Sequence, residues 1–271
     1  MSANQLKQSI RQNFAKAAPA YNYHALVQQE IIDKLIRRIK HIALPFEPRI
    51  LEIGAGTGIL TRKLQNFWPH AEYVITDLSD HMLDQARQII PIQGPKTSYV
   101  AMDADQLCFD RGFDLIVSSM ILHWLPNPPA SMEKINGLLN SGGIFAFAFL
   151  AENSFASWRQ SCHQAGVPCG LWDYPTLEQI KSITGVMAVQ ERIQTFFDHP
   201  VDFLHNLKSI GAATPQKSYR MQSAANLKKA LLQASSIKPF YINYEVIFGA
   251  YHAARDIADL PNALNASPIT S

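Results

Sequence analysis

A glycine-rich segment that follows a short apolar run is the strongest chemical signal in the sequence. Its acidic residue and its glycines occupy every second position, at Glu52, Gly54, Gly56 and Gly58. Glycines let the backbone turn sharply and approach a ligand closely, and a helix that begins after such a turn points its first N–H groups at that ligand. A dinucleotide fingerprint would place glycine at position 59, where this chain has Ile59. The pattern therefore predicts a ligand-binding turn and weakens the hydride-transfer interpretation.

Acidic residues follow the next two apolar segments of the chain. Asp77 ends residues 73–77, where one carboxylate can accept hydrogen bonds from both hydroxyls of a ribose, and Asp103 follows residues 98–101. In this order and at this spacing, the turn and the acidic residues resemble the motifs of class I S-adenosylmethionine-dependent methyltransferases. The resemblance implies S-adenosyl-L-methionine as the cofactor, with Asp103 near its adenine and the end of residues 113–118 beside its donor methyl. The cofactor-binding candidates beyond the turn are Asp77, Leu78, Asp103, Ala104 and Ser118.

No other arrangement of catalytic residues is visible in the sequence. His123 follows residues 113–118, where it is either a base or a structural polar residue. There is no Ser-His-Asp order, no metal-ligand cluster and no phosphate-binding loop, so no metal is expected. The three cysteines have an odd count and no C-x-x-C spacing, which argues against disulfides and a zinc site and predicts a reducing, cytoplasmic location.

Strand and helix patterns alternate along the chain. An amphipathic helix is predicted over residues 25–43, and a helix over 132–139 is expected to close at Ser141-Gly142-Gly143. Predicted strands lie at residues 49–53, 73–77, 98–101, 113–118, 144–150, 189–197 and 240–249. This alternation is typical of βαβ units. The expected fold class is therefore α/β, a doubly wound, mostly parallel seven-stranded sheet of the Rossmann-like kind.

The sequence predicts one main domain with additions. Residues 1–45 form an N-terminal helical segment expected to close over the cofactor, and residues 46–260 form the methyltransferase domain with helical inserts around 152–187 and 200–236. Residues 261–271 are expected to be a flexible tail. The first 29 residues lack acidic side chains, as mitochondrial transit peptides do, but the helical pattern that follows favours folded structure. A cleaved leader stays an open alternative.

Charge is unevenly distributed along the 271 residues, although the net charge is +2. Residues 1–45 carry seven basic and two acidic side chains, and residues 200–238 carry six and one. If these segments adjoin in space they would attract an acidic partner; the alternative is that they are solvated helix faces. No apolar run approaches the roughly 20 residues of a membrane span, so no membrane is expected as a partner. No nucleic-acid partner is expected either.

Several strings outside the cofactor motifs carry a more specific resemblance. They are Phe14–Tyr21, His24–Gln28, Leu122–Trp124, Phe147–Phe149, Asn153–Phe155, Leu207–Ala212 and Tyr244–Gly249. These strings are similar to the malonyl-[acyl-carrier protein] O-methyltransferase family of biotin synthesis, along most of the chain. The chain departs from that family at His205, where relatives carry arginine, and at His123, where they carry glutamine.

This resemblance implies methyl transfer to the free carboxylate of a malonyl thioester on acyl-carrier protein or coenzyme A. A carboxylate with a pKa of about 4 is already ionised at neutral pH, so it needs positioning rather than a general base. Tyr21 is expected to close the cofactor pocket, Trp124 to wall the acceptor site, and Lys208 to hold the substrate end or the phosphopantetheine. With His123, these are the catalytic candidates. The chain is expected to be monomeric.

Two alternatives remain open at the level of the sequence. The first is a methyltransferase of the same fold that acts on a free carboxylic acid or a quinone; a carbon acceptor would need a base, for which His123 is the candidate. The second is a methyltransferase-like assembly factor of a respiratory complex, which keeps the fold without methyl transfer. The intact glycines with Asp77 and Asp103 argue against lost cofactor binding but leave the acceptor undecided.

Overall fold

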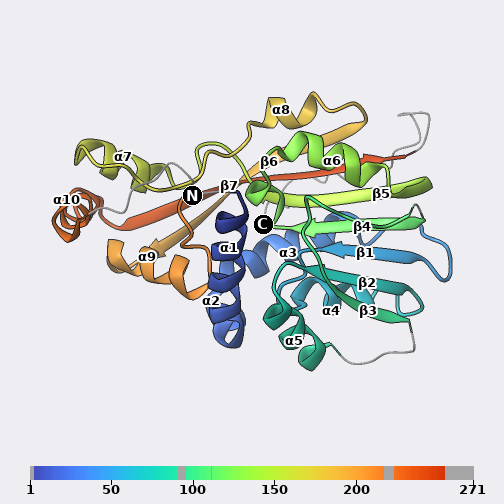
Figure 1. The fold of residues 1–271 in the computed structure, drawn as a ribbon. Helices are drawn as coiled ribbons and strands as arrows, with labels where there is room; N and C mark the ends of the chain where they lie inside the picture. Colours follow the sequence, from blue (N-terminus) through green and yellow to red (C-terminus); the bar gives the residue numbers. More distant parts are fainter. Residues whose placement is uncertain (1–2, 91–95, 111, 217–222, 254–271) are drawn as a thin grey trace, which may run out of the picture.

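A seven-stranded sheet organises the chain, whose computed structural model describes residues 3–90, 96–110, 112–216 and 223–253 (Figure 1). The strand order is β3-β2-β1-β4-β5-β7-β6, and β7 runs antiparallel to both of its neighbours while the other paired strands are parallel. The strands are β1 (Arg49–Ile53), β2 (Glu72–Asp77), β3 (Thr97–Ala101), β4 (Phe113–Ser119), β5 (Leu139–Leu150), β6 (Val186–Phe197) and β7 (Phe240–His252). The predicted doubly wound, mostly parallel sheet is confirmed.

Helices cover both faces of the sheet because successive strand residues point to opposite sides. Ile50 of β1 belongs to the core that includes buried residues of α3, α4 and α5, whereas Leu51 and Ile53 belong to the core that includes those of α6 and α8. These helices are α3 (Leu26–Ile39), α4 (Ile59–Gln65), α5 (Asp80–Ile89), α6 (Pro128–Asn136) and α8 (Leu177–Lys181). The molecule is therefore layered as helix, sheet and helix.

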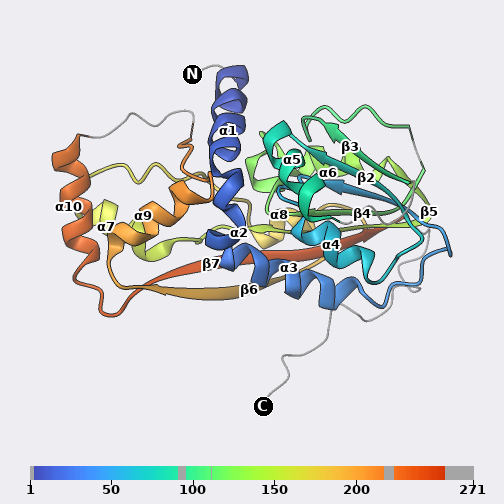
Figure 2. The ribbon, with the colours of Figure 1, turned by 90° about the horizontal axis from the view of Figure 1, so that it is seen from below.

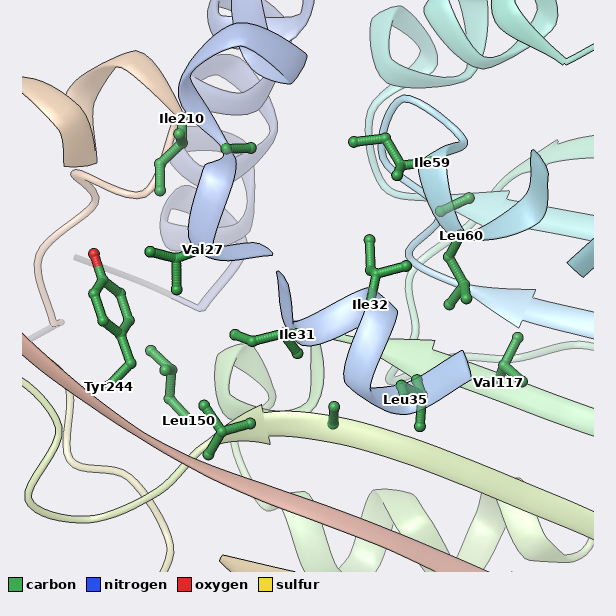
Figure 3. Close-up of a cluster of buried hydrophobic side chains, with 14 of the residues drawn as sticks. Val27, Ile31, Ile32, Leu35, Ile59, Leu60, Val117, Leu150, Ile210 and Tyr244 are labelled. Atoms are coloured by element: carbon green, nitrogen blue, oxygen red, sulfur yellow. The ribbon is translucent and has the colours of Figure 1, made fainter. Parts of the chain in front are cut away.

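The N-terminal segment forms a chain of helices that leads onto the sheet. They are α1 (Ala3–Ala17), the 3-10 turn η1 (Ala18–Ala20), α2 (Tyr21–His24) and α3. Figure 3 shows Ile31, Ile32 and Leu35 of α3 packed above β5, so the predicted amphipathic helix at residues 25–43 is confirmed in its position. Helix α1 stands between α9 on one side and α5 on the other (Figure 2). It thus lies across the carboxyl ends of the first strands.

The second half of the chain extends the sheet beyond the end of β5. Pairing between β5 and β7 ends at Leu150 and Val246, but β6 and β7 stay paired as far as Phe197 and Phe240. Three helices surround this extension: α7 (Ala156–Gln164), α9 (Pro200–Ser209) and α10 (Ala224–Ala234) (Figures 1 and 2). The extension and its helices face the carboxyl ends of β1, β2 and β4 across α1.

Two details of the sequence-based prediction were wrong. The helix expected at 132–139 is α6, which begins at Pro128 because the Asn127 side chain caps it by accepting from the Ala130 N–H. Ser141–Gly143 does not close that helix but lies within β5, whose register against β4 shifts there. The helical insert predicted around residues 200–236 contains the two helices α9 and α10. The predicted tail at 261–271 lies outside the described residues.

Candidate active site

A cavity of about 740 Å³ lies at the carboxyl ends of β1, β2 and β4 and extends to α7, α9 and α10. Most of the residues singled out from the sequence line it: Tyr21, Glu52, Gly54, Gly56, Asp77, Leu78, Asp103, Ala104, His123, Trp124 and Lys208. Its position agrees with the rule that ligands of open α/β sheets bind beyond the carboxyl ends of the strands. The cavity thus joins the predicted cofactor residues and the predicted acceptor residues in one space.

Two glycines of the turn between β1 and α4 have a positive φ and no room for a Cβ, each against a different neighbour. Gly54 has a φ of +73°, and a Cβ there would lie 2.0 Å from a side-chain carbon of Ile121. Gly58 has a φ of +83° and caps α4, where a Cβ would lie 2.6 Å from Ile90. Gly58 does not line the cavity. It therefore shapes the turn and packs the following helix, whereas Gly54 lets the backbone approach the cavity.

Asp77 is held rigidly at the end of β2. One of its carboxylate oxygens accepts from the Gly56 N–H at 2.9 Å, and the other accepts from the Ser79 N–H at 2.8 Å. Burial raises the pKa of Asp77 to about 6 despite these hydrogen bonds, which act in the opposite direction. Tyr21 lines the same part of the cavity, and burial and then the Asp77 charge raise the pKa of its hydroxyl.

Glu52 is a buried carboxyl group at the end of β1. Its side chain accepts a hydrogen bond from the Thr61 hydroxyl, and it lines the cavity although the residue is 1% exposed. Burial, and to a smaller extent the Asp77 charge, raises the pKa of Glu52 to about 8. A cation in the cavity would favour the ionised form. S-adenosylmethionine carries a positively charged sulfur and would be such a cation.

Asp103 lies on the other side of the cofactor region, after β3. It forms an ion pair with Lys7 of α1 at 2.6 Å, and its second oxygen accepts from the Asp105 N–H at 3.0 Å. Lys7 also lies 3.3 Å from an oxygen of Asp105 and lines the cavity. Lys7 could not be predicted as a site residue, because no local sequence pattern links it to Asp103, 96 residues away.

Ser118 is a correction to the predicted cofactor set. It is fully buried, and its hydroxyl donates to the Ile53 carbonyl at 3.1 Å, which ties β4 to β1. It does not line the cavity, whereas the next residue, Ser119, does. Ser119 is followed by Met120, whose φ of +62° is unusual for a residue other than glycine. At this end of β4, Ser119 and not Ser118 therefore borders the cavity.

Aromatic side chains enclose the part of the cavity beyond β4. The Trp124 ring lies edge-on to Phe14 of α1 at 5.9 Å and to Trp172 at 5.3 Å between ring centroids. His123 lies edge-on to Tyr174 at 5.5 Å, and burial lowers the pKa of His123 to about 3, so its ring is neutral. Trp172 and Tyr174 were missed because the loop that carries them has no periodic pattern. The clustering of aromatic residues in that loop is the sequence feature that could have indicated these two residues.

The cavity opens toward α9 and α10. Lys208 and His205 of α9 and Leu227 of α10 all line the cavity and are all exposed to solvent. Among the described residues, the side chain of Lys208 makes no hydrogen bond or ion pair, although its backbone carbonyl accepts from the Gly211 N–H. The predicted substrate lysine thus lies at the opening rather than in the depth of the cavity.

Neither a metal site nor a membrane helix is found in the described ranges. Within residues 3–90, 96–110, 112–216 and 223–253, no group of three or more His, Cys, Asp or Glu side chains is arranged to hold a metal ion. Over the same ranges, no helix is long and apolar enough to cross a membrane.

Comparisons with known proteins agree with this geometry. Residues 50–143 match a family described as a methyltransferase domain. The chain is 35% identical to the malonyl-[acyl-carrier protein] O-methyltransferase of Magnetococcus marinus, over 91% of this chain and 93% of that protein. It is 31% identical to the biotin biosynthesis bifunctional protein BioCD of Bordetella avium, over 92% of this chain and 53% of that larger protein.

A solved structure shares the fold at much lower identity. The N-methyltransferase NodS of Bradyrhizobium japonicum, in complex with S-adenosyl-L-homocysteine, aligns with a TM-score of 0.53 and 19% identity, over 91% of this chain and 97% of that chain. This likeness shows the fold alone. The extent of the match to the Magnetococcus protein shows more: this chain belongs to the malonyl-[acyl-carrier protein] O-methyltransferase family of class I S-adenosylmethionine-dependent methyltransferases.

Proposed function

We propose that this chain transfers a methyl group from S-adenosylmethionine to the free carboxylate of a malonyl thioester, in the early pimeloyl stage of biotin synthesis. The observation that carries the proposal is one continuous cavity that joins the glycine turn to an aromatic compartment with a neutral histidine. Such a compartment suits an acceptor that is already ionised and needs no base. The family relationship supports the same substrate class.

The cofactor is proposed to be held by the residues that line the first part of the cavity. Asp77 would accept hydrogen bonds from the ribose hydroxyls, Glu52 would balance the positive charge, and Asp103 with Ala104 would lie along the adenine. Leu78 would contribute apolar contact. The bound cofactor supplies a methyl group on a positively charged sulfur, and Tyr21 would close that region from α2.

The acceptor chemistry is proposed to proceed without proton transfer. A carboxylate oxygen takes the methyl group, the electron pair of the broken bond stays on sulfur, and two opposite charges disappear. An apolar compartment accelerates such a step because it solvates separated charges poorly. Trp124 would wall this compartment. His123 is neutral near pH 7 and would contribute contact and one hydrogen bond, not general-base catalysis.

The carrier protein is proposed to dock beside the opening of the cavity. Lys228 and Lys229 of α10 are exposed and follow Leu227, which lines the cavity. By contrast, several basic residues of the N-terminal segment already pair with acidic groups of the chain: Lys7, Arg11, Lys34 and Arg38. The exposed lysines beside the opening of the cavity lie on α9 and α10, and Lys208 there is proposed to meet the phosphate of the phosphopantetheine.

We further propose that the chain acts as a monomer in the cytoplasm. Its cysteines Cys108, Cys162 and Cys169 are all free, which suits a reducing compartment.

A labelled-methyl assay tests the proposed function. Purified protein is incubated with methyl-labelled S-adenosylmethionine and, in parallel, with malonyl-carrier protein, malonyl coenzyme A, free malonate and acetyl-carrier protein. We expect a base-labile methyl ester on the two malonyl thioesters, and none on the acetyl carrier, which lacks the free carboxylate. Methylation of free acids or of a quinone in place of the thioesters would overturn the proposal. Cofactor binding with no transfer to any acceptor would instead favour the assembly-factor alternative.

A further inference from the structure

Trp172 lines the acceptor side of the cavity and is held at both its backbone and its ring. Its backbone carbonyl accepts a hydrogen bond from the Arg159 guanidinium, and its indole N–H donates to the Thr214 carbonyl at 2.9 Å. The Trp172 ring in turn lies edge-on to Trp124, with 5.3 Å between the centroids. The orientation of this ring therefore depends on the position of Thr214, which lies 42 residues further along the chain.

Thr214 is itself held by helix α1. The side-chain amide of Asn13 donates a hydrogen bond to the Thr214 hydroxyl at 2.8 Å, although 201 residues separate the two. Thr214 is buried and lines the cavity, whereas Asn13 is half-buried and does not line it. Asn13 thus contacts the cavity wall from behind, where neither ligand reaches.

Phe14, the next residue of α1, contacts the same wall. Its ring lies edge-on to Trp124 at 5.9 Å between centroids. Gly211 packs closely against it: this glycine has a φ of +75°, and a Cβ there would lie 2.9 Å from the Phe14 Cα. Helix α1 therefore contacts the pair of tryptophans at both ends. Phe14 touches Trp124, and Asn13 holds the residue that binds Trp172.

An earlier part of α1 is held by the cofactor side of the cavity. Lys7 forms an ion pair with Asp103, and Arg11 forms one with Asp80. Asn13 lies six residues after Lys7, about 9 Å along the axis of the helix. One helix therefore contacts both ends of the cavity. Loss of the Asn13 contact alone would leave both ion pairs in place at the cofactor end.

We propose that Asn13 is a positioning residue for the acceptor, because it holds Thr214 and thereby fixes the Trp172 ring against Trp124. This inference rests on the proposed function. A wall that is fixed before the acceptor arrives loses less conformational freedom when the acceptor binds, so the affinity for the acceptor is higher. Asn13 touches neither ligand. Its effect is therefore on binding of the acceptor rather than on binding of the cofactor or on the chemical step.

Asn13→Ala tests this inference with malonyl coenzyme A as the acceptor. We expect KM to rise about fivefold while kcat stays within about twofold, because one hydrogen bond behind the wall is lost. The Kd of S-adenosylmethionine by calorimetry should change by less than about twofold, since Lys7 and Arg11 still hold α1. Gln12→Ala is the matched control, because Gln12 is exposed on the same helix and does not line the cavity. Its KM should equal that of the wild type.

Two variants of Thr214 test the same hydrogen bond from its other end. Thr214→Val removes the hydroxyl at nearly constant shape and should raise KM about as much as Asn13→Ala does. Thr214→Ser keeps the hydroxyl and should keep KM within about twofold of the wild type.

A double-mutant cycle separates positioning through Trp172 from a general contribution to the fold. Trp172→Phe keeps an aromatic ring but removes the indole N–H that donates to Thr214. If Asn13 acts through this link, adding Asn13→Ala to Trp172→Phe should raise KM by no more than about twofold further. If the Asn13 hydrogen bond only stabilises the fold, the two effects should multiply, and Asn13→Ala should cost the full fivefold, about as much as it does alone.

The wild-type rate with malonyl coenzyme A is measured first, because it tests the proposed function alone. A wild-type chain without transfer to malonyl thioesters would overturn that function and the inference with it. With an active wild type, three results would each overturn the inference and leave the proposed function intact. They are an unchanged KM in Asn13→Ala, an equal loss of cofactor affinity, and an undiminished effect of Asn13→Ala in the Trp172→Phe background.

Discussion

Lys7 and Asp103 form an ion pair across the cofactor region, with 2.6 Å between the lysine Nζ and a carboxylate oxygen, although 96 residues separate them. Lys7 belongs to α1, and Asp103 follows β3. A second link between the N-terminal segment and the body is the hydrogen bond from the Thr57 hydroxyl of the glycine turn to the Asn22 side chain. The N-terminal helices are thus attached to both the adenine side and the glycine side of the proposed cofactor site.

Removal of this ion pair should speed cofactor release. In Lys7→Ala, α1 loses a partly buried ion pair worth on the order of 1 kcal/mol, so we expect S-adenosylmethionine to dissociate about fivefold faster. Stopped-flow displacement measures that rate. Lys16→Ala is the matched control, because Lys16 lies on the same helix, is exposed and has no recorded ion pair among the described residues. Equal rates in the two variants would contradict the proposed role of α1.

Glu52 should make the stability of the cofactor-free protein depend on pH. Its pKa is raised in the folded chain from an ordinary 4.5 to about 8. The stabilisation is therefore fully present below pH 4.5 and is lost as the pH rises through 8. Glu52→Gln does not titrate, so the unfolding free energy of the wild type relative to this variant should fall by about 4 kcal/mol between about pH 5 and about pH 9.

Urea unfolding of both proteins across that pH range measures the Glu52 effect. A difference that stays constant with pH would show that Glu52 ionises normally in the fold. Saturation with S-adenosylmethionine should reduce the pH dependence of the wild type, since the bound cation favours the charged carboxylate.

The neighbouring serines at the end of β4 should respond in opposite ways to loss of the hydroxyl. Ser118→Ala removes the hydrogen bond to the Ile53 carbonyl and should lower the unfolding free energy by about 1 kcal/mol, with substrate-saturated activity retained. Ser119→Ala removes a buried hydroxyl without a partner in the described part of the chain, so it should keep stability but lower kcat/KM several-fold. Thermal melts measure the stability of both variants, and steady-state kinetics on the same preparations measure kcat/KM. If Ser118→Ala instead lowered kcat/KM and Ser119→Ala lowered the unfolding free energy, Ser118 would be the serine at the ligand.

Charge reversal on α10 tests the docking surface. The double variant Lys228→Glu with Lys229→Glu should raise KM for malonyl-carrier protein about tenfold and leave KM for malonyl coenzyme A within about twofold, because the coenzyme has no acidic protein surface. The effect should shrink at high salt. Lys181→Glu, an exposed lysine on α8, serves as the control. Equal losses on both acceptors would contradict docking at α10.

The part of the site that depends on local sequence was predictable. The glycine turn and Asp77 each follow from a few adjacent residues, and the structure brings them together at the carboxyl ends of β1 and β2. Ser118 does not border the cavity, whereas the next residue, Ser119, does. Strand residues alternate between faces, so a shift of one residue exchanges a buried position for a cavity position.

The residues on the acceptor side of the cavity were harder to predict from the sequence. Trp172 lies in a loop without periodicity, and its indole N–H donates to the Thr214 carbonyl 42 residues away. Tyr244 lies in a strand whose hydrophobic pattern is explained by burial, so only the three-dimensional structure shows that its hydroxyl has no hydrogen-bond partner among the described residues. Contacts of this kind depend on tertiary packing between distant segments, which local patterns do not encode.

The central claim is that the methyl group reaches the carboxylate oxygen of a malonyl thioester. The most direct measurement is an NMR spectrum of malonyl-carrier protein after turnover with S-adenosylmethionine whose methyl carbon is isotopically labelled. We expect a labelled methyl signal of an ester on the carrier-bound malonyl group, and this signal should disappear after mild base. A labelled methyl bonded to carbon, or label found on free acids while the carrier stays unmodified, would contradict it.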